Sequence, residues 1–341
     1  MFYPTERRTV AQALALTNGA INRFSNIFPL DGTGWTLMRL IFHSIHTTAI
    51  TTPAIVNGGY RWIKGIKLTT SRGETIVDNV PGEAFRIYQG LHRGHLPFQD
   101  RLLIANGAVT DWIVEIPFCQ DYLNRPEDTI FDSGRYSNLQ LDITGGTFLD
   151  FGAAGVTAVA VTMDIEIENT LSALSPDGKS KPYAHAYFRN YGPLVQTAVT
   201  GLYDLESSLD LGLFGFLIKT CTTGLMPCAF DGISTDILAN LTFRDSVRRW
   251  VDNSLGFSLR QNVLKLCDYD NNLLHYSVGD NIDTMDPVKT LQGIYCHFFV
   301  ENGSINEHYA TGKKSLIRID FQTANANDVS SVLVWGMRAL R

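Results

Sequence analysis

The two halves of this 341-residue chain carry similar segments in the same order, and this internal similarity constrains the fold more than any single motif. A Val-Asp-Asn step with a glycine three residues later occurs in each half, and its first residues, Val77 and Val251, lie 174 positions apart. The aligned positions are Val77, Asp78, Asn79, Gly82 and Arg86 in the first half and Val251, Asp252, Asn253, Gly256 and Arg260 in the second. We therefore expect two tandem copies of one unit.

Further matches keep the same order along the chain. The matched segments are Ile66–Thr69 with Ala239–Thr242, Ser137–Ile143 with Ser315–Phe321, and Val156–Met163 with Ser330–Met337. Matches this short also arise by chance, so the repeat has to be checked against a structure. If it is real, Val77 and Val251 lie on equivalent strands, and so do Leu141 and Ile319.

Alternation of apolar and polar residues predicts a mainly β protein. Leu139–Ile143 and Ala158–Glu168 alternate as half-buried strands do. Trp112–Phe118 and Gly293–Val300 are apolar runs typical of buried strands. Turns rich in glycine, asparagine and proline separate these segments, and many short strands with such turns indicate β-sandwiches or barrels.

The first 30 residues are the best candidate for a helix. Apolar side chains recur at helical spacing over Thr5–Phe28, at Val10, Ala13, Leu14, Ile21, Phe24 and Phe28. We therefore expect an N-terminal helical arm over residues 1–30, although the turn signal Asn18-Gly19 interrupts the pattern.

A few short helices are expected elsewhere. One should follow each Val-Asp-Asn step, with apolar positions at Phe85, Tyr88 and Leu91 in the first half and Leu259, Val263 and Cys267 in the second. Asp245–Val251 also suits a helix, which competes with a strand there. The turn-rich stretch Leu174–Tyr183 lies near the midpoint, so we expect one β-unit over residues 31–174 and another over 183–341.

Composition narrows the class of protein. Hydrophobic residues make up 45% of the chain and charged residues only 18%, which suits a packed core and surfaces buried against partners. The net charge of −6 argues against nucleic acid as the main partner, because phosphate binding needs clustered Lys and Arg. Five scattered cysteines favour reduced thiols, and no run is long enough for a membrane-spanning helix.

Two histidine pairs and one acidic loop are candidate metal sites. His43 and His46, if they lie on a strand, face opposite sides, and His92 and His95 suit a loop better than a ligand pair. Asp268–Asn272 begins like a calcium loop, but leucine and glycine then replace its required glycine and glutamate. We predict no metal and no cofactor.

No catalytic motif is present either. The chain lacks a nucleophile elbow, a P-loop and a dinucleotide fingerprint. Asp78 and Asp252 recur in both halves, but an Asp-Asn step before glycine usually serves a turn. Tyr187, Phe188 and Tyr191 could form a binding platform, while core or interface packing is the more ordinary use of such a cluster. We predict no catalytic residue and no enzyme activity.

The organisation of the chain resembles the double jelly-roll major capsid proteins of tailless icosahedral bacteriophages with an internal membrane, in the style of a Flavobacterium-infecting lipid phage. The strand–turn–strand of Ile66–Ile76, the step from Val77 through Gly82 into a short helix, and the second copy at Leu241–Arg260 carry the resemblance. It implies two tandem eight-stranded jelly-roll β-sandwiches.

The resemblance also implies a role. Homotrimers would form pseudo-hexameric capsomers that tile an icosahedral shell over an internal membrane, assembled in the host cytoplasm and located in the virion capsid. The implied partners are copies of the chain itself, neighbouring capsomers, penton and minor capsid proteins. Contact with the membrane would come from the N-terminal arm through Arg7, Arg8, Phe24 and Phe28.

Two other classes of protein stay open at this stage. A bicupin-type or other double jelly-roll enzyme would need paired histidines and a glutamate converging on a metal, and the chain has no His-x-His followed by glutamate. A carbohydrate-binding or host-binding viral spike protein would expose aromatic residues on one sheet.

Overall fold

Strands dominate the computed structural model, which describes residues 5–46, 58–93, 109–151, 159–170, 182, 184–196, 200–221, 238–255, 293–321 and 328–340. In the first half the strands are β1 (Thr5–Leu16), β2 (Ile21–Ser25), β3 (Gly34–His46), β4 (Ile63–Thr70), β5 (Thr75–Val80), β6 (Val109–Pro117), β7 (Phe131–Asp132), β8 (Leu139–Gly145) and β9 (Val159–Thr170). In the second half they are β10 (Ala184–Gln196), β11 (Thr200–Leu205), β12 (Leu211–Cys221), β13 (Leu238–Asp245), β14 (Arg249–Leu255), β15 (Ile294–Phe298), β16 (Tyr309–Ala310), β17 (Ser315–Phe321) and β18 (Asp328–Ala339).

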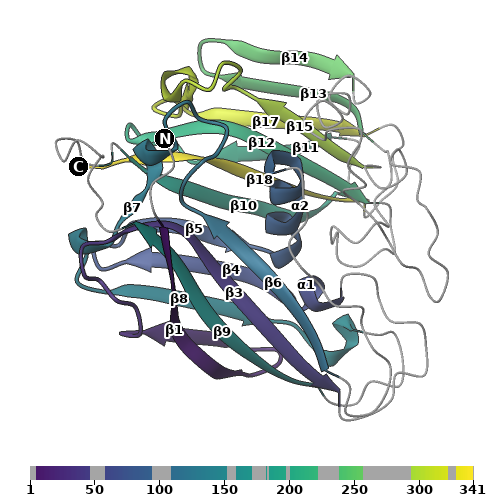
Figure 1. The fold of residues 1–341 in the computed structure, drawn as a ribbon. Coiled ribbons are helices and arrows are strands. Elements are labelled where there is room, and N and C mark those ends of the chain that lie inside the picture. Colours follow the sequence, from purple (N-terminus) through teal and green to yellow (C-terminus); the bar gives the residue numbers. More distant parts are fainter. Residues whose placement is uncertain are drawn as a thin grey trace.

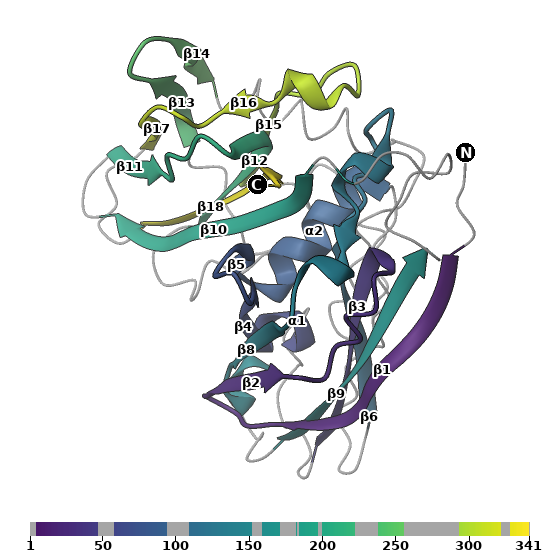
Figure 2. The same cartoon turned by 90° about the vertical axis from the view of Figure 1, so that its left-hand side faces the viewer.

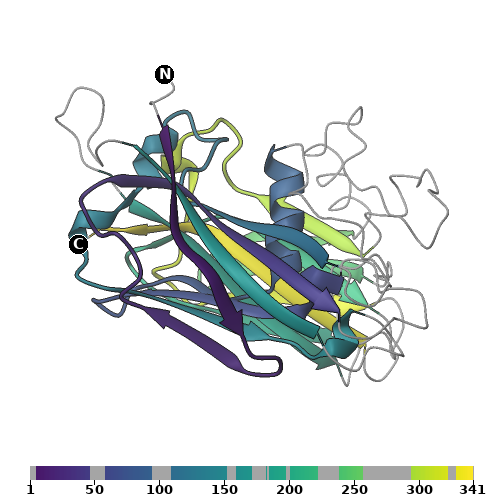
Figure 3. The ribbon, with the colours of Figure 1, turned by 60° about the horizontal axis from the view of Figure 1, so that its bottom comes forward.

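Each half has the strand order of a jelly roll. In the first, the sheet β1-β9-β3-β6 faces the strands β2-β8-β4-β5; in the second, β10-β18-β12-β15 faces β11-β17-β13-β14. Counted along each half, the eight main strands therefore pair as 1-8-3-6 and 2-7-4-5 in both. The two-residue strands β7 and β16 also match, since each pairs with the third main strand. Figure 1 shows the first roll below the second, and Figure 3 shows β1, β9, β3 and β6 side by side.

The predicted repeat is confirmed in its strands. Val77 and Val251 lie on the fifth main strands, β5 and β14, and Leu141 and Ile319 on the seventh, β8 and β17. The pairing register also agrees, because Leu68 lies opposite Leu141 and Leu241 lies opposite Ile319.

One pair of matched segments lies on equivalent strands, but the matched side chains point to opposite faces of the sheet. Val161 and Met163 of β9 point into the first sandwich. Their sequence matches on β18, Trp335 and Met337, point away from the second sandwich, whose interior takes Val332 and Val334 instead. Both faces of β18 are buried, so its apolar pattern gives no sign of which residues face which side.

The predicted N-terminal helical arm is wrong. Residues 5–16 and 21–25 are β1 and β2, and Asn18-Gly19 is the turn between them, with Gly19 at φ +69°. An Asn-Gly pair is a strong turn signal, and here it connects strands of the two opposite sheets and outweighs the helical spacing of the apolar residues. These strands are the first two of the first roll, so residues 5–30 are not a separate arm.

Other expectations have mixed outcomes. Helix α2 (Gly82–Arg93) follows the first Val-Asp-Asn step as predicted, while the segment after the second step lies outside the described residues. Residues 245–251 are a strand–turn–strand rather than a helix. The expected boundary at 174–183 falls between β9 and β10 and lies, apart from Pro182, outside the described residues. A short helix not predicted, α1 (Gly58–Trp62), precedes β4.

Two hydrophobic cores hold the molecule together. One fills the second sandwich, with Leu241, Phe243 and Ile319 among its members. The other fills the first sandwich and continues through α2 to the outer face of the second roll's sheet, where it includes Phe188 and Trp335. Helix α2 therefore lies between the two rolls, as Figure 2 shows.

Candidate functional site: the junction between the two rolls

The two rolls are joined edge to edge into one sheet. Strand β5 of the first roll pairs in parallel with β10 of the second, and Val77 and Asp78 lie opposite Phe188 and Arg189. Nine strands consequently form one continuous sheet across the molecule. Because the rest of each sheet is antiparallel, this short parallel contact marks the seam between two complete units.

Helix α2 seals the seam with aromatic side chains. The ring of Tyr88 lies 5.2 Å from that of Phe188 and 5.3 Å from that of Trp335, both in edge-to-face contact. Phe85 makes a third such contact, 5.2 Å from Phe188. All four rings are almost fully buried, so burial of apolar area is the main force between the rolls.

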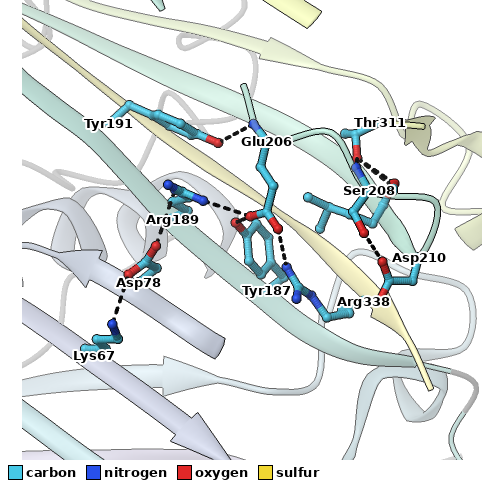
Figure 4. Close-up of polar contacts among 11 residues, drawn as sticks. Lys67, Asp78, Tyr187, Arg189, Tyr191, Glu206, Ser208, Asp210, Thr311 and Arg338 are labelled. Carbon is cyan, nitrogen blue, oxygen red and sulfur yellow. Dashed lines mark hydrogen bonds and ion pairs between the residues drawn. The ribbon is translucent and has the colours of Figure 1, made fainter. Parts of the chain in front are cut away.

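A network of polar side chains also lies at the junction (Figure 4). The guanidinium of Arg189 contacts Asp78 of the first roll at 3.3 Å and Glu206 of the second at 2.8 Å. The same Glu206 carboxylate accepts hydrogen bonds from the Tyr187 hydroxyl at 2.8 Å and from Arg338 at 3.0 Å. Arg189 on β10 thus links β5 of the first roll to the segment that follows β11 in the second.

Local geometry fixes the position of Arg189. Its guanidinium lies over the ring of Tyr191, 4.8 Å from the centroid, and the Tyr191 hydroxyl accepts a hydrogen bond from the backbone amide of Glu206. Burial would raise the pKa of Glu206, but the hydrogen bond from Tyr187 and the charges of Arg338 and Arg189 outweigh it and lower that pKa.

A second polar contact crosses the same junction. Glu74, just before β5, lies 3.7 Å from Nε2 of His185 on β10 and accepts a hydrogen bond from the Tyr136 hydroxyl at 2.8 Å. The contact with His185 is the largest cause, and together with Tyr136 it lowers the pKa of Glu74 to about 2. Glu74 is therefore a carboxylate at neutral pH, and its charge helps to hold the junction.

The histidines considered as metal ligands do not converge. His43 lies on β3 between two carboxylates, with Nδ1 2.8 Å from Asp111 and Nε2 3.4 Å from Asp164, while the side chain of His46 and the whole of His95 lie outside the described residues. His92 is buried among aromatic rings, and burial lowers its pKa to about 3. Over the described ranges, no three His, Cys, Asp or Glu side chains are placed to hold a metal ion.

The other residues considered as site candidates form ion pairs or pack in the protein interior. Asp78 faces Lys67 and Arg189, and Asp252 pairs with Arg249 at 3.1 Å. Tyr187 and Phe188 are buried, so they do not form an exposed binding platform. The calcium-like loop at 268–272 lies outside the described residues. In the part of the chain that the structure describes, no helix is long and apolar enough to cross a membrane.

Sequence reasoning found Asp78 but missed its partners. Arg189, Glu206 and Arg338 come from distant parts of the chain, and no local motif links them. The one usable signal was the recurrence of Asp78 as Asp252, which marks equivalent edge strands rather than a catalytic carboxylate.

No protein-family model and no curated protein matches the chain. Solved structures do match over its whole length. The major capsid protein of Sulfolobus Turreted Icosahedral Virus aligns with a TM-score of 0.66 and 12% identity, covering 99% of this chain and 97% of that one.

Two further structures agree. The major capsid protein of bacteriophage PM2 gives a TM-score of 0.59 at 9% identity, over 99% of this chain and 98% of that one. The Faustovirus major capsid protein gives 0.60 at 8% identity, over 100% and 91%. The chain thus has the double jelly-roll fold, as its strand order shows independently.

Proposed function

We propose that this protein is the major capsid protein of an icosahedral virus. The observation that carries the proposal is the agreement of nearly the entire chain, both rolls and their relative placement, with major capsid proteins. Fold likeness at low identity is compatible with other functions, so the surfaces have to support the role as well.

The fold supports an assembly role. Each copy carries two rolls of the same strand order side by side, so three copies around a threefold axis present six similar units and can fill a sixfold position in a shell. We propose such a homotrimer, with obligate interfaces on the scale of roughly 2,000–5,000 Å². Neighbouring capsomers, penton proteins and minor capsid proteins are its proposed partners, and the virion, assembled in the host cytoplasm, is its proposed location.

An internal membrane beneath the shell is part of this proposal, but the first strands do not provide the contact in the way expected. Phe28 is buried beside Trp35, with their rings 6.0 Å apart, and Phe24 is half-buried. Arg8 is paired with Asp31 at 2.9 Å, which leaves Arg7 as an exposed cation. An amphipathic helix lying on lipid is excluded for residues 5–16 and 21–25.

Two measurements separate the proposal from an enzyme or a spike protein. Light scattering of the purified protein should give three times the chain mass of 37.9 kDa, and metal analysis by mass spectrometry should find no stoichiometric transition metal. Asp78→Ala and His95→Ala should alter folding or assembly only. A monodisperse monomer, or a metal-dependent activity lost in either variant, would contradict the capsid role.

A further inference from the structure

Two strands at the ends of the molecule correspond to the two strands that pair at the junction within one copy. Inside the copy, the fifth strand of the first roll, β5, pairs with the first strand of the second, β10. The fifth strand of the second roll is β14, and the first strand of the first roll is β1. Neither has a partner strand on its outer edge among the described residues, and Figure 1 shows them at opposite ends.

The two unpaired edge strands, β1 and β14, are more exposed than β10 and β5, which occupy the same places in the other roll. The first five residues of β10 are buried, whereas the first five of β1, Thr5–Thr9, are exposed. On β5, Ile76 is fully buried, whereas its counterpart Trp250 on β14 is 45% exposed, while Val77 and Val251 are both buried. Asp78 is half-buried, whereas its counterpart Asp252 is exposed. Strands in the same topological place thus differ because one pair is covered and the other is not.

We infer that β14 of one copy lies beside β1 of a second copy and repeats there the contact that β5 makes with β10. This inference rests on the proposed trimer and adds the strands that build it. Such a head-to-tail contact closes into a ring when the rotation suits. Three copies then give six like junctions, three within copies and three between them, and the sheets join through strand addition.

Charge complementarity supports a second copy as the partner. Within a copy, Asp78 on β5 faces Arg189 on β10. In the second roll Asp252 on β14 takes the place of Asp78, and β1 carries the exposed Arg7 and also Arg8, which pairs with Asp31. Among the described residues, Asp252 pairs along its own strand with Arg249, and both side chains are more than half exposed. A carboxylate on the fifth strand and arginines on the first therefore recur on the two open edges.

The second strands provide an internal control. β2 and β11 are also edge strands, but they occupy the same place in the two rolls and neither is paired on its outer side within the described ranges. An open edge alone thus does not predict contact. The prediction applies to β1 and β14 because their equivalents are paired within the copy.

Disulfide trapping tests the contact. Asp252→Cys is combined in turn with Arg7→Cys, Thr9→Cys or Gln12→Cys, because the register between copies is not fixed beforehand. Neighbouring strands lie about 4.8 Å apart, within the Cα separation of roughly 4.4–6.8 Å that a disulfide needs. Mild oxidation should convert one of these variants into covalent trimers on a non-reducing gel. The controls are each single variant, because the chain has five native cysteines, and Leu202→Cys on β11 combined with the same β1 variants.

The outcomes distinguish the proposed contact between β14 and β1 from the proposed capsid role. Cross-linking at least tenfold above the Leu202→Cys controls supports the contact. A protein that is trimeric by light scattering but cross-links no better than those controls overturns the strand assignment and leaves the capsid role intact. A monomeric parent protein overturns both.

Hydrogen exchange provides a test without added cysteines. In the intact trimer, outward amides of β1 and β14 should exchange as slowly as those of β5 and β10, while those of β2 and β11 exchange faster. If β14 exchanges as fast as β11, the contact does not exist.

Discussion

Arg189 shows how one side chain joins parts of the chain that are far apart in sequence. It contacts Asp78 of the first roll and Glu206 of the second and lies over the ring of Tyr191. A guanidinium suits this position because its planar donors can serve two carboxylates while its face stacks on an aromatic ring. Lysine at position 189 would provide the charge without this geometry.

Replacing Arg189 by methionine should lower the free energy of unfolding by about 1.5–3 kcal/mol, the cost of losing hydrogen bonds to charged groups. Glu206 keeps Arg338 at 3.0 Å and Asp78 keeps Lys67 at 4.0 Å, but both lose the guanidinium that joins them. Urea unfolding at fixed protein concentration measures the effect. The control is Lys314→Met, whose ion pair with Asp204 is exposed and should matter by less than about 1 kcal/mol. Equal effects of the two changes would show that the junction network adds no stability.

Glu74 makes the stability of the junction depend on pH. Its pKa is lowered from 4.5 to about 2 in the folded protein, so its contribution is fully present above pH 4.5 and is lost as the pH falls towards 2. Glu74→Gln should therefore lower the stability at pH 7 by about 1–2 kcal/mol and converge with the parent protein in acid. Denaturant unfolding from pH 7 to 2 measures this, with the exposed Asp204→Asn as control. A difference that stays constant across this range would contradict the assignment.

At the scale of elements, the N-terminal segment of residues 5–28 contributes a strand to each sheet of the first roll. Strand β1 pairs with β9, and β2 pairs with β8. Removing this segment uncovers the edges of both sheets and takes Leu16 and Phe28 from the core. The segment is therefore part of the folded subunit.

Deletion of residues 2–28 should leave the protein unfolded or insoluble. Two strands and part of the first core are lost, and exposed sheet edges promote aggregation. Solubility and circular dichroism after expression provide the measurement, and deletion of residues 2–4 alone, which precede β1, is the control. A soluble trimer lacking residues 2–28 would show that this segment is dispensable.

The N-terminal segment also shows where sequence reasoning succeeds and fails. Regular alternation correctly predicted β8 and β9, an apolar run predicted the buried β6, and the repeat placed Val77 and Val251 on equivalent strands. In β1, bulges near Thr9 and Ala11 shift the register, which disturbs the two-residue alternation and produces a spacing that resembles a helix. The junction network could not be predicted, because its partners meet only through tertiary pairing.

At the scale of the whole molecule, the two rolls share a sheet and a core. Nine strands are continuous across the seam, and the core of the first roll extends to Trp335 of the second. Neither roll can separate without exposing the aromatic face of α2. We therefore expect the chain to behave as one cooperative unit despite its two-domain plan.

Calorimetry should show a single unfolding transition. Phe85→Ala, which removes a fully buried ring at the seam, should cost about 3–5 kcal/mol and separate the transition into two by weakening the link between the rolls. The control is Leu209→Ala, because Leu209 is 92% exposed and should have little effect. Two transitions in the unaltered protein would show that the rolls unfold independently.

The aromatic face of α2 also affects how the chain folds while it is being synthesised. Helix α2 belongs to the first roll, but the rings it packs against, Phe188 and Trp335, lie in the second. At roughly 5–20 residues per second, the ribosome takes about 10–30 s after finishing β9 to deliver β18. During that interval a folded first roll exposes Phe85 and Tyr88 to solvent. A chaperone that covers this helix while the second half is made would therefore raise the yield of folded protein without touching the finished subunit.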